Sequence, residues 1–124
     1  MPIRMRFMPQ RGLLVSVAHG RLTMDDLLHH RQRVAESTHY HPGLHLLFDT
    51  RRTSAIGVSG DAVRTFAGFG QPGQRRFARM ALLVGSDLHY GISRIFQAYA
   101  GQHDESTLRI IRDPGEAWRW INER

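Results

Sequence analysis

The short apolar run at residues 44–52, LHLLFDTRR, constrains the fold of this chain more than any other feature. Leucine and phenylalanine dominate its first half, and Asp49, Arg51 and Arg52 follow directly. A run of this length with so few polar breaks is typical of a strand covered on both faces, as in a parallel sheet flanked by helices. At the carboxyl end of such a strand an open α/β sheet usually binds its ligand or partner.

Strand and helix patterns alternate along the rest of the chain. Residues 3–7 alternate apolar side chains with arginine, which predicts an edge strand, and residues 13–18 predict a more buried second strand. Helices are predicted over Thr23–Glu36, after Ser59, after Ser86 and after Asp113. Residues 77–84 and 108–111 predict the remaining strands. The order ββαβαβαβα favours one α/β domain, residues 1–124, with a single five-stranded, mostly parallel (mixed) sheet and four helices.

Several local expectations follow from the same patterns. The first helix is expected to bury an apolar face that includes Leu28 and Ala35. Residues 53–58 are expected to form a small polar loop after the central strand. Trp118, in the last helix, is expected to be more exposed than Trp120.

The composition limits the cellular location and the classes of binding partner that can be expected. The net charge is +6 and all 17 basic residues are arginine, but they form no basic tail or helical stripe, so specific nucleic-acid binding is not expected. The absence of cysteine excludes disulfides and thiolate ligands. No apolar run approaches the roughly 20 residues of a transmembrane helix, and the first residues lack the apolar segment of a signal peptide. We therefore expect a cytoplasmic protein.

Several local motifs, in their order along the chain, resemble the SpoIIAA-like family, the small stand-alone relatives of the STAS domain. They are Gly20-Arg21-Leu22-Thr23 with Asp26-Leu27 and His30, Tyr40 with Pro42-Gly43, Leu47-Phe48-Asp49 with Arg51, Ala81 to Val84 with Ser86-Asp87, Tyr90-Gly91 and Arg94, and Arg112-Asp113 with Glu116-Ala117 and Trp120-Ile121. The resemblance implies a five-stranded mixed sheet with an antiparallel edge strand. It also implies a bacterial module that resembles the anti-sigma-factor antagonists. Proteins of a related fold, the SEC14 type, carry lipids, so the resemblance also suggests a lipid-like ligand.

In the sporulation antagonists that this family is named for, a serine at the start of the second helix is phosphorylated in an Asp-Ser-Ser-Gly setting. Here Ser59 and Gly60 match the end of that motif, but Gly57-Val58 replaces the preceding Asp-Ser pair. This departure favours a plain helix N-cap at Ser59 over a regulated phosphorylation site.

The candidate binding site lies where the parallel strands end. Backbone N–H groups at two predicted helix N-termini, at Ser59-Gly60 and Ser86-Asp87, attract anions. Arginine binds phosphate or carboxylate through two parallel hydrogen bonds. A glycine-flanked lid would cover the site. The candidate rim and lid residues are Asp49, Arg51, Arg52, Ser59, Gly60, Phe66, Phe69, Ser86, Asp87 and Tyr90, with His19 beside them. The alternative is that Asp49 pairs with Arg51 or with a helix cap and merely fixes the loop.

Catalytic and metal signatures are absent from the sequence. His39, His41 and His45 crowd one turn, but there is no HExxH motif, so we expect core or solvated histidines and no metal. There is no GxSxG elbow and no lysine for a Walker-type phosphate loop. We therefore expect no enzyme activity and no cofactor.

Three functions remain after these exclusions. The first is a non-enzymatic STAS-like binding or regulatory module that acts through a protein partner. The second is a carrier or sensor of a small lipid-like, amphipathic or anionic ligand in a pocket under the second helix. The third is a homodimer or larger oligomer joined through the edge strand or an apolar helix face.

Overall fold

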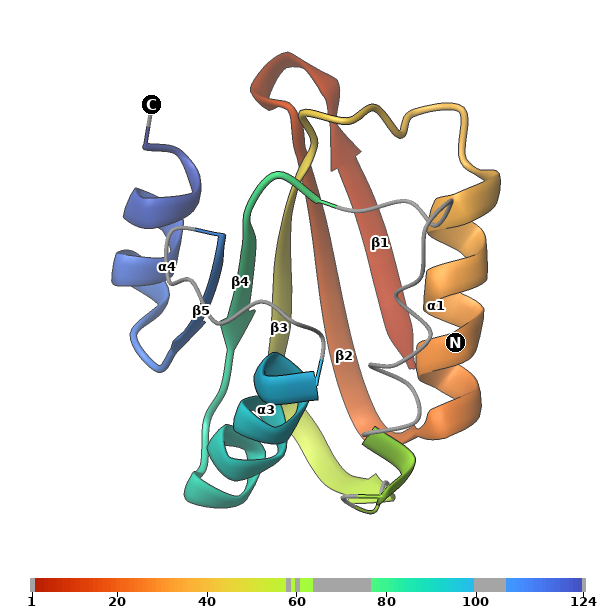
Figure 1. The fold of residues 1–124 in the computed structure, drawn as a ribbon, viewed down its shortest axis with the longest axis vertical. Coiled ribbons are helices and arrows are strands. Elements are labelled where there is room, and N and C mark those ends of the chain that lie inside the picture. The colour runs from red at the N-terminus through yellow and green to blue at the C-terminus, as the bar shows by residue number, and fades with distance from the viewer. Residues whose placement is uncertain (1, 58, 60, 64–76, 100–106, 124) are drawn as a thin grey trace.

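The computed structural model of the protein describes residues 2–57, 59, 61–63, 77–99 and 107–123 (Figure 1). Five strands form one mixed sheet whose spatial order follows the chain, β1-β2-β3-β4-β5. β1 (Ile3–Met8) pairs antiparallel with β2 (Leu13–Thr23), and the remaining strands are added in parallel. These are β3 (His45–Gly57), β4 (Met80–Leu83) and β5 (Leu108–Ile111). The predicted α/β fold with a mixed five-stranded sheet and an antiparallel edge strand is confirmed.

The helices begin where the sequence predicts. α1 (Met24–Glu36) has a capping box in which Thr23 and Asp26 each bind the other's backbone N–H. α3 (Asp87–Tyr99) follows Ser86, and α4 (Pro114–Ile121) follows Asp113, whose side chain accepts from Gly115 N. The second helix is described over residues 61–63. None of the helices in the described ranges is both long and apolar enough to span a bilayer.

The apolar run of β3 is buried because both faces of the sheet are covered. Leu46 and Phe48 join the α1 cluster (Ile3, Leu14, Ala18, Leu22, Val34, Leu44, Leu46, Phe48). Leu47 points the other way into the α4 cluster (Leu13, Leu47, Ala81, Leu83, Ile111, Ala117, Trp120, Ile121). Figure 1 shows α1 and α4 on opposite sides of the sheet.

Strand order decides which helix covers which face. Parallel strands that follow chain order with right-handed crossovers place their connecting helices on one face, here the α1 face. α4 comes after the last strand and covers the other face, where it contacts β3, β4 and β5. On that face the α4 cluster includes Leu13 at the start of β2, and no described helix covers the rest of the half-sheet made by β1 and β2.

Two strands are longer than predicted. Residues 53–57 are not a polar loop: they continue β3 and pair in parallel with the end of β2. β2 itself runs past Ala18 to Thr23, because Gly20 takes a left-handed φ of 70° at a register shift and lets the strand continue. β4, in contrast, begins at Met80 and is shorter than the predicted residues 77–84.

One predicted helix face is corrected and one is confirmed. Leu28 is 41% exposed and Ala35 is exposed, whereas His30 and Val34 are the buried residues of α1. His30 takes the inward position because its ring has a hydrogen-bond partner there, Ser16 of β2. Trp118 is half-buried against the α4 cluster, whereas Trp120 is buried at 4% exposure, so the prediction that Trp118 is the more exposed of the two is confirmed.

Candidate functional site

Asp49 and Arg51 form a closed ion pair within β3. The Asp49 carboxylate accepts hydrogen bonds from Arg51 Nε at 3.1 Å, Nη2 at 2.9 Å and the backbone N–H at 3.0 Å. Burial raises the pKa of Asp49, but the hydrogen bonds and charge of Arg51 outweigh it and hold that pKa below its usual value. Asp49 in turn raises the pKa of Arg51. The pairing expected under the alternative interpretation is present, although it lies inside a strand and not in a loop.

The start of α3 gathers three of the predicted rim residues. Ser86 Oγ accepts from His89 N at 3.1 Å and so caps the helix. Asp87 accepts from Arg112 Nη2 at 2.6 Å, and the same guanidinium lies over the Tyr90 ring, 5.0 Å from its centroid. Arg112 was not among the predicted site residues. Its position, one residue after β5, is the signal that could have placed it at the same edge as Ser86.

A chain of hydrogen bonds joins β3 to α3 through His89, which was also not predicted. Thr50 Oγ1 donates to Leu83 O at 2.9 Å, and Thr53 Oγ1 donates to Thr50 O at 2.7 Å. Thr53 Oγ1 also lies 3.4 Å from His89 Nδ1. Because the Thr53 hydroxyl proton is directed to Thr50 O, the His89 ring is oriented with Nδ1 as the donor. Burial lowers the pKa of His89 and favours the neutral ring.

The predicted rim residues are only partly brought together. Asp49 is level with the end of β4, and a Cβ on Gly85 would lie 3.5 Å from Arg51 Cα, so the Asp49–Arg51 pair adjoins the start of α3. Ser59 is separated from Arg51 by six further residues of strand, about 20 Å of extended chain. Its hydroxyl accepts from Ala62 N at 3.1 Å, as expected of an N-cap.

The other predicted site residues lie elsewhere. Arg52 is exposed on β3. His19 is half-buried on β2, and its Nε2 has no hydrogen-bond partner among the residues that the structure describes. Gly60, Phe66 and Phe69 lie outside the described residues, so the predicted lid and the pocket beneath it do too.

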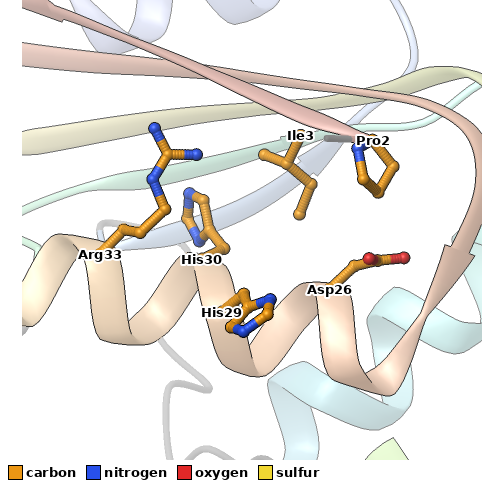
Figure 2. Close-up of a pocket in the computed structure, with 6 residues that line it drawn as sticks. All are labelled: Pro2, Ile3, Asp26, His29, His30 and Arg33. Carbon is orange, nitrogen blue, oxygen red and sulfur yellow. The ribbon is translucent and has the colours of Figure 1, made fainter.

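A small hollow opens between the start of β1 and α1 (Figure 2). Its cavity volume is about 10 Å³, room for about one water molecule, and it is lined by Pro2, Ile3, Asp26, His29, His30 and Arg33. Asp26 is engaged by Thr23 and His30 by Ser16. The hollow is below the roughly 300–1,000 Å³ of most small-molecule sites, and two of its polar side chains are already partnered.

The uncovered half of the sheet is basic. Ile3, Met5 and Phe7 pack toward the α1 cluster, so the alternation of β1 places Arg4 and Arg6 on the opposite face. Both arginines are exposed.

β2 continues this surface. In register, Arg4 lies opposite Val17 and Arg6 opposite Val15. Both valines are half-buried, and Val15 packs against the α4 cluster. Arg21, further along β2, is exposed and lies next to Leu22, which points into the α1 cluster, so Arg21 belongs to the opposite face. We call Arg4, Arg6, Val15, Val17 and Arg21 the open face.

Metal binding has no support in the described ranges. No three histidine or carboxylate side chains there are arranged to hold a metal ion. His45 has Nδ1 unpartnered within the same ranges, and burial with the nearby charge of Arg79 lowers its pKa. His39 instead packs against Phe7, with ring centroids 5.2 Å apart.

Comparisons with known proteins inform the fold. No family model and no curated protein matches this chain. A solved structure does: an uncharacterized protein of the DUF3478 family, with a SpoIIAA-like fold, from Shewanella loihica PV-4. The two chains are 18% identical and superpose with a TM-score of 0.60 over 96% of this chain and 91% of the other. The chain therefore has a SpoIIAA-like fold.

Proposed function

We propose that this chain is a non-enzymatic binding or regulatory module that acts through a protein partner. The observation that supports this proposal is the open face. It combines exposed arginines with half-buried valines on a half-sheet that no described helix covers. Surfaces that mix apolar area with arginine are typical of protein interfaces.

The predicted rim residues beside the start of α3, Asp49, Arg51 and Asp87, are a weaker candidate for a binding surface. Arg51 is held by Asp49 and Arg112 by Asp87, so the two guanidinium groups beside α3 already have carboxylate partners. An incoming anion would have to displace one of these carboxylates. The hydrogen bonds around His89 also end on backbone carbonyls and hydroxyls of the protein itself. The geometry supports the protein-partner function better than the carrier or sensor of a small ligand.

Site-specific photocrosslinking in the source cells tests the proposal. The chain has no lysine, so amine-reactive crosslinkers would act at little more than the N-terminus, and a photoreactive residue is needed instead. It is placed at Arg6 on the open face and, as a control, at Gln32 on the exposed surface of α1. A discrete protein adduct from position 6 that is absent from position 32 is the expected result.

Native mass spectrometry of the gently purified chain completes the test. A bare chain mass together with the position 6 adduct agrees with a protein-partner module. A retained small molecule that leaves on denaturation, with no adduct at position 6, would overturn the proposal in favour of a carrier.

A further inference from the structure

We propose that the open face binds an extended acidic segment of a partner protein. This inference rests on the function proposed above and names the chemistry of the partner. It is carried by the charge, the spacing and the position of the open face, and by the poor fit of other occupants.

The open face carries positive charge without an internal counter-ion. Within the described ranges Arg4, Arg6 and Arg21 form no ion pair. Asp49 is the in-register neighbour of Val17 on β3, and its carboxylate is already bound by Arg51. Carboxylates of another molecule can therefore pair with these arginines, and carboxylates are the groups in proteins that arginine binds best.

The spacing of the arginines matches an extended chain. Arg4 and Arg6 are two residues apart on one strand face, roughly 7 Å, which is the repeat of alternate side chains on a partner strand. β1 is also the edge strand of the sheet, so its outer backbone groups face no other described strand. A segment with alternating acidic and apolar residues could pair with this edge and set its carboxylates beside both arginines. Its apolar residues would then point to the other face of the sheet, beside Met5 and Phe7 of β1.

A second copy of the chain fits the edge poorly. In an antiparallel pairing of two β1 strands centred on Met5, Arg4 of one copy would lie opposite Arg6 of the other. Like charges directly opposite one another destabilise a strand pair. The charges that would stabilise an acidic segment thus disfavour the edge-to-edge homodimer.

Two other anionic occupants fit less well. Single-stranded nucleic acid is usually held by aromatic side chains that stack on bases, and none of the open-face residues is aromatic. An anionic bilayer is usually entered by exposed large apolar residues. Leu28 and Leu88 are of that kind, but they lie on α1 and α3, the helices of the other face. The acidic protein segment is therefore favoured.

Peptide binding measured by fluorescence anisotropy tests the inference. The probe is a labelled peptide of alternating glutamate and valine, compared with the same peptide carrying lysine for glutamate. We expect saturable binding of the glutamate peptide, no binding of the lysine peptide, and weaker binding at high salt. The double variant Arg4→Glu/Arg6→Glu should bind the glutamate peptide at least about tenfold more weakly.

A matched control separates local contacts from net charge. Arg33→Glu/Arg94→Glu changes the net charge equally on exposed positions of α1 and α3, and should leave the affinity unchanged. The neutral pair Arg4→Gln/Arg6→Gln gives a milder version of the test if charge reversal impairs folding. Tryptophan fluorescence of Trp120, which is buried, verifies that each variant is folded.

Several outcomes would overturn the inference. They are absence of saturable glutamate-peptide binding, equal losses in the test and control variants, and tighter binding of an oligo-thymidine or of phosphatidylserine vesicles through Arg4 and Arg6. A position 6 adduct without peptide binding would leave the protein-partner function standing and refute the acidic segment alone. Loss of both signals would refute both proposals.

Discussion

Acidification is expected to destabilise this protein through His30. The residue is buried at 8% exposure, its Nε2 lies 2.7 Å from Ser16 Oγ, and its ring meets Phe48 edge-on. Burial, followed by the positive charges of Arg33 and Arg31, lowers the pKa of His30 from 6.5 to about 4. The unfolded chain therefore takes up this proton at a higher pH than the folded chain does.

The sign and size of the effect follow from this difference. Between pH 6.5 and about pH 4 the unfolded state binds more protons, so the free energy of unfolding falls as the pH falls through this window. At about 1.36 kcal/mol per pH unit, the shift corresponds to a loss of about 3 kcal/mol by about pH 4. Above pH 6.5 both states are neutral at His30 and its contribution is constant.

Urea unfolding followed by the fluorescence of Trp118 and Trp120 measures this loss at a series of pH values. The control is the double variant Ser16→Ala/His30→Leu, which removes both partners of the buried hydrogen bond and leaves neither unsatisfied. Other titrating groups, His45 and His89 among them, remain in both proteins, so the difference between the two isolates His30. The variant should lose about 3 kcal/mol less than the wild type between about pH 7 and about pH 4. Equal losses in the two proteins would refute the reasoning.

Three substitutions test other parts of the structure in the same unfolding assay. Asp49→Asn, which breaks the part-buried pair of the buried Asp49 carboxylate with Arg51, should cost about 1.5–3 kcal/mol. Asp87→Asn, whose side chain is 93% exposed, should cost less than about 1 kcal/mol, and equal effects would contradict the assigned burial of Asp49. Gly20→Ala should destabilise the protein by about 1 kcal/mol or more because φ at Gly20 is +70°. Gly91→Ala should stabilise it by about 0.5–1 kcal/mol because alanine has the higher helix propensity and Gly91 lies in α3 with open space around it. A more stable Gly20→Ala variant than Gly91→Ala variant would refute the left-handed conformation of Gly20. Trp120→Ala, whose urea unfolding is followed by far-UV circular dichroism because the fluorescent side chain is removed, should cost about 3–5 kcal/mol, and a loss below about 1 kcal/mol would show that α4 does not pack as described.

Periodicity and capping made most of the fold predictable. The run around Leu47 indicated a strand covered on both faces, and Thr23 and Asp113 marked helix starts through local hydrogen bonds that any isolated segment can form. Residues 53–57 failed as a prediction because their pairing partner, the end of β2, is distant in the chain and because strand propensity depends on such context. His30 was missed as a core residue for a similar reason, since its partner Ser16 lies on another element.

The candidate site was less predictable than the fold. Sequence order placed Ser86 and Asp87 correctly at a helix start, because caps are local. It could not show that Arg112 reaches Asp87 or that Thr53 reaches His89, since both contacts join segments far apart in the chain. The open face was missed because it depends on which half of the sheet α4 covers, a property of topology that the alternation of Arg4 and Arg6 alone does not reveal.

The agreement between strand order and chain order also bears on how the chain folds during synthesis. Of the described strands, β1 and β2 leave the ribosome before the others, and each later one adds to an edge that already exists. None of the described strands has to be inserted between two others, so pairing can begin before the later strands are made. β5 and α4 then cover Leu47, Ala81 and Leu83 after the other described strands have paired. Chains that lack residues 108–123 would retain four of the five described strands but expose this apolar surface, which would mark them for chaperones and proteases.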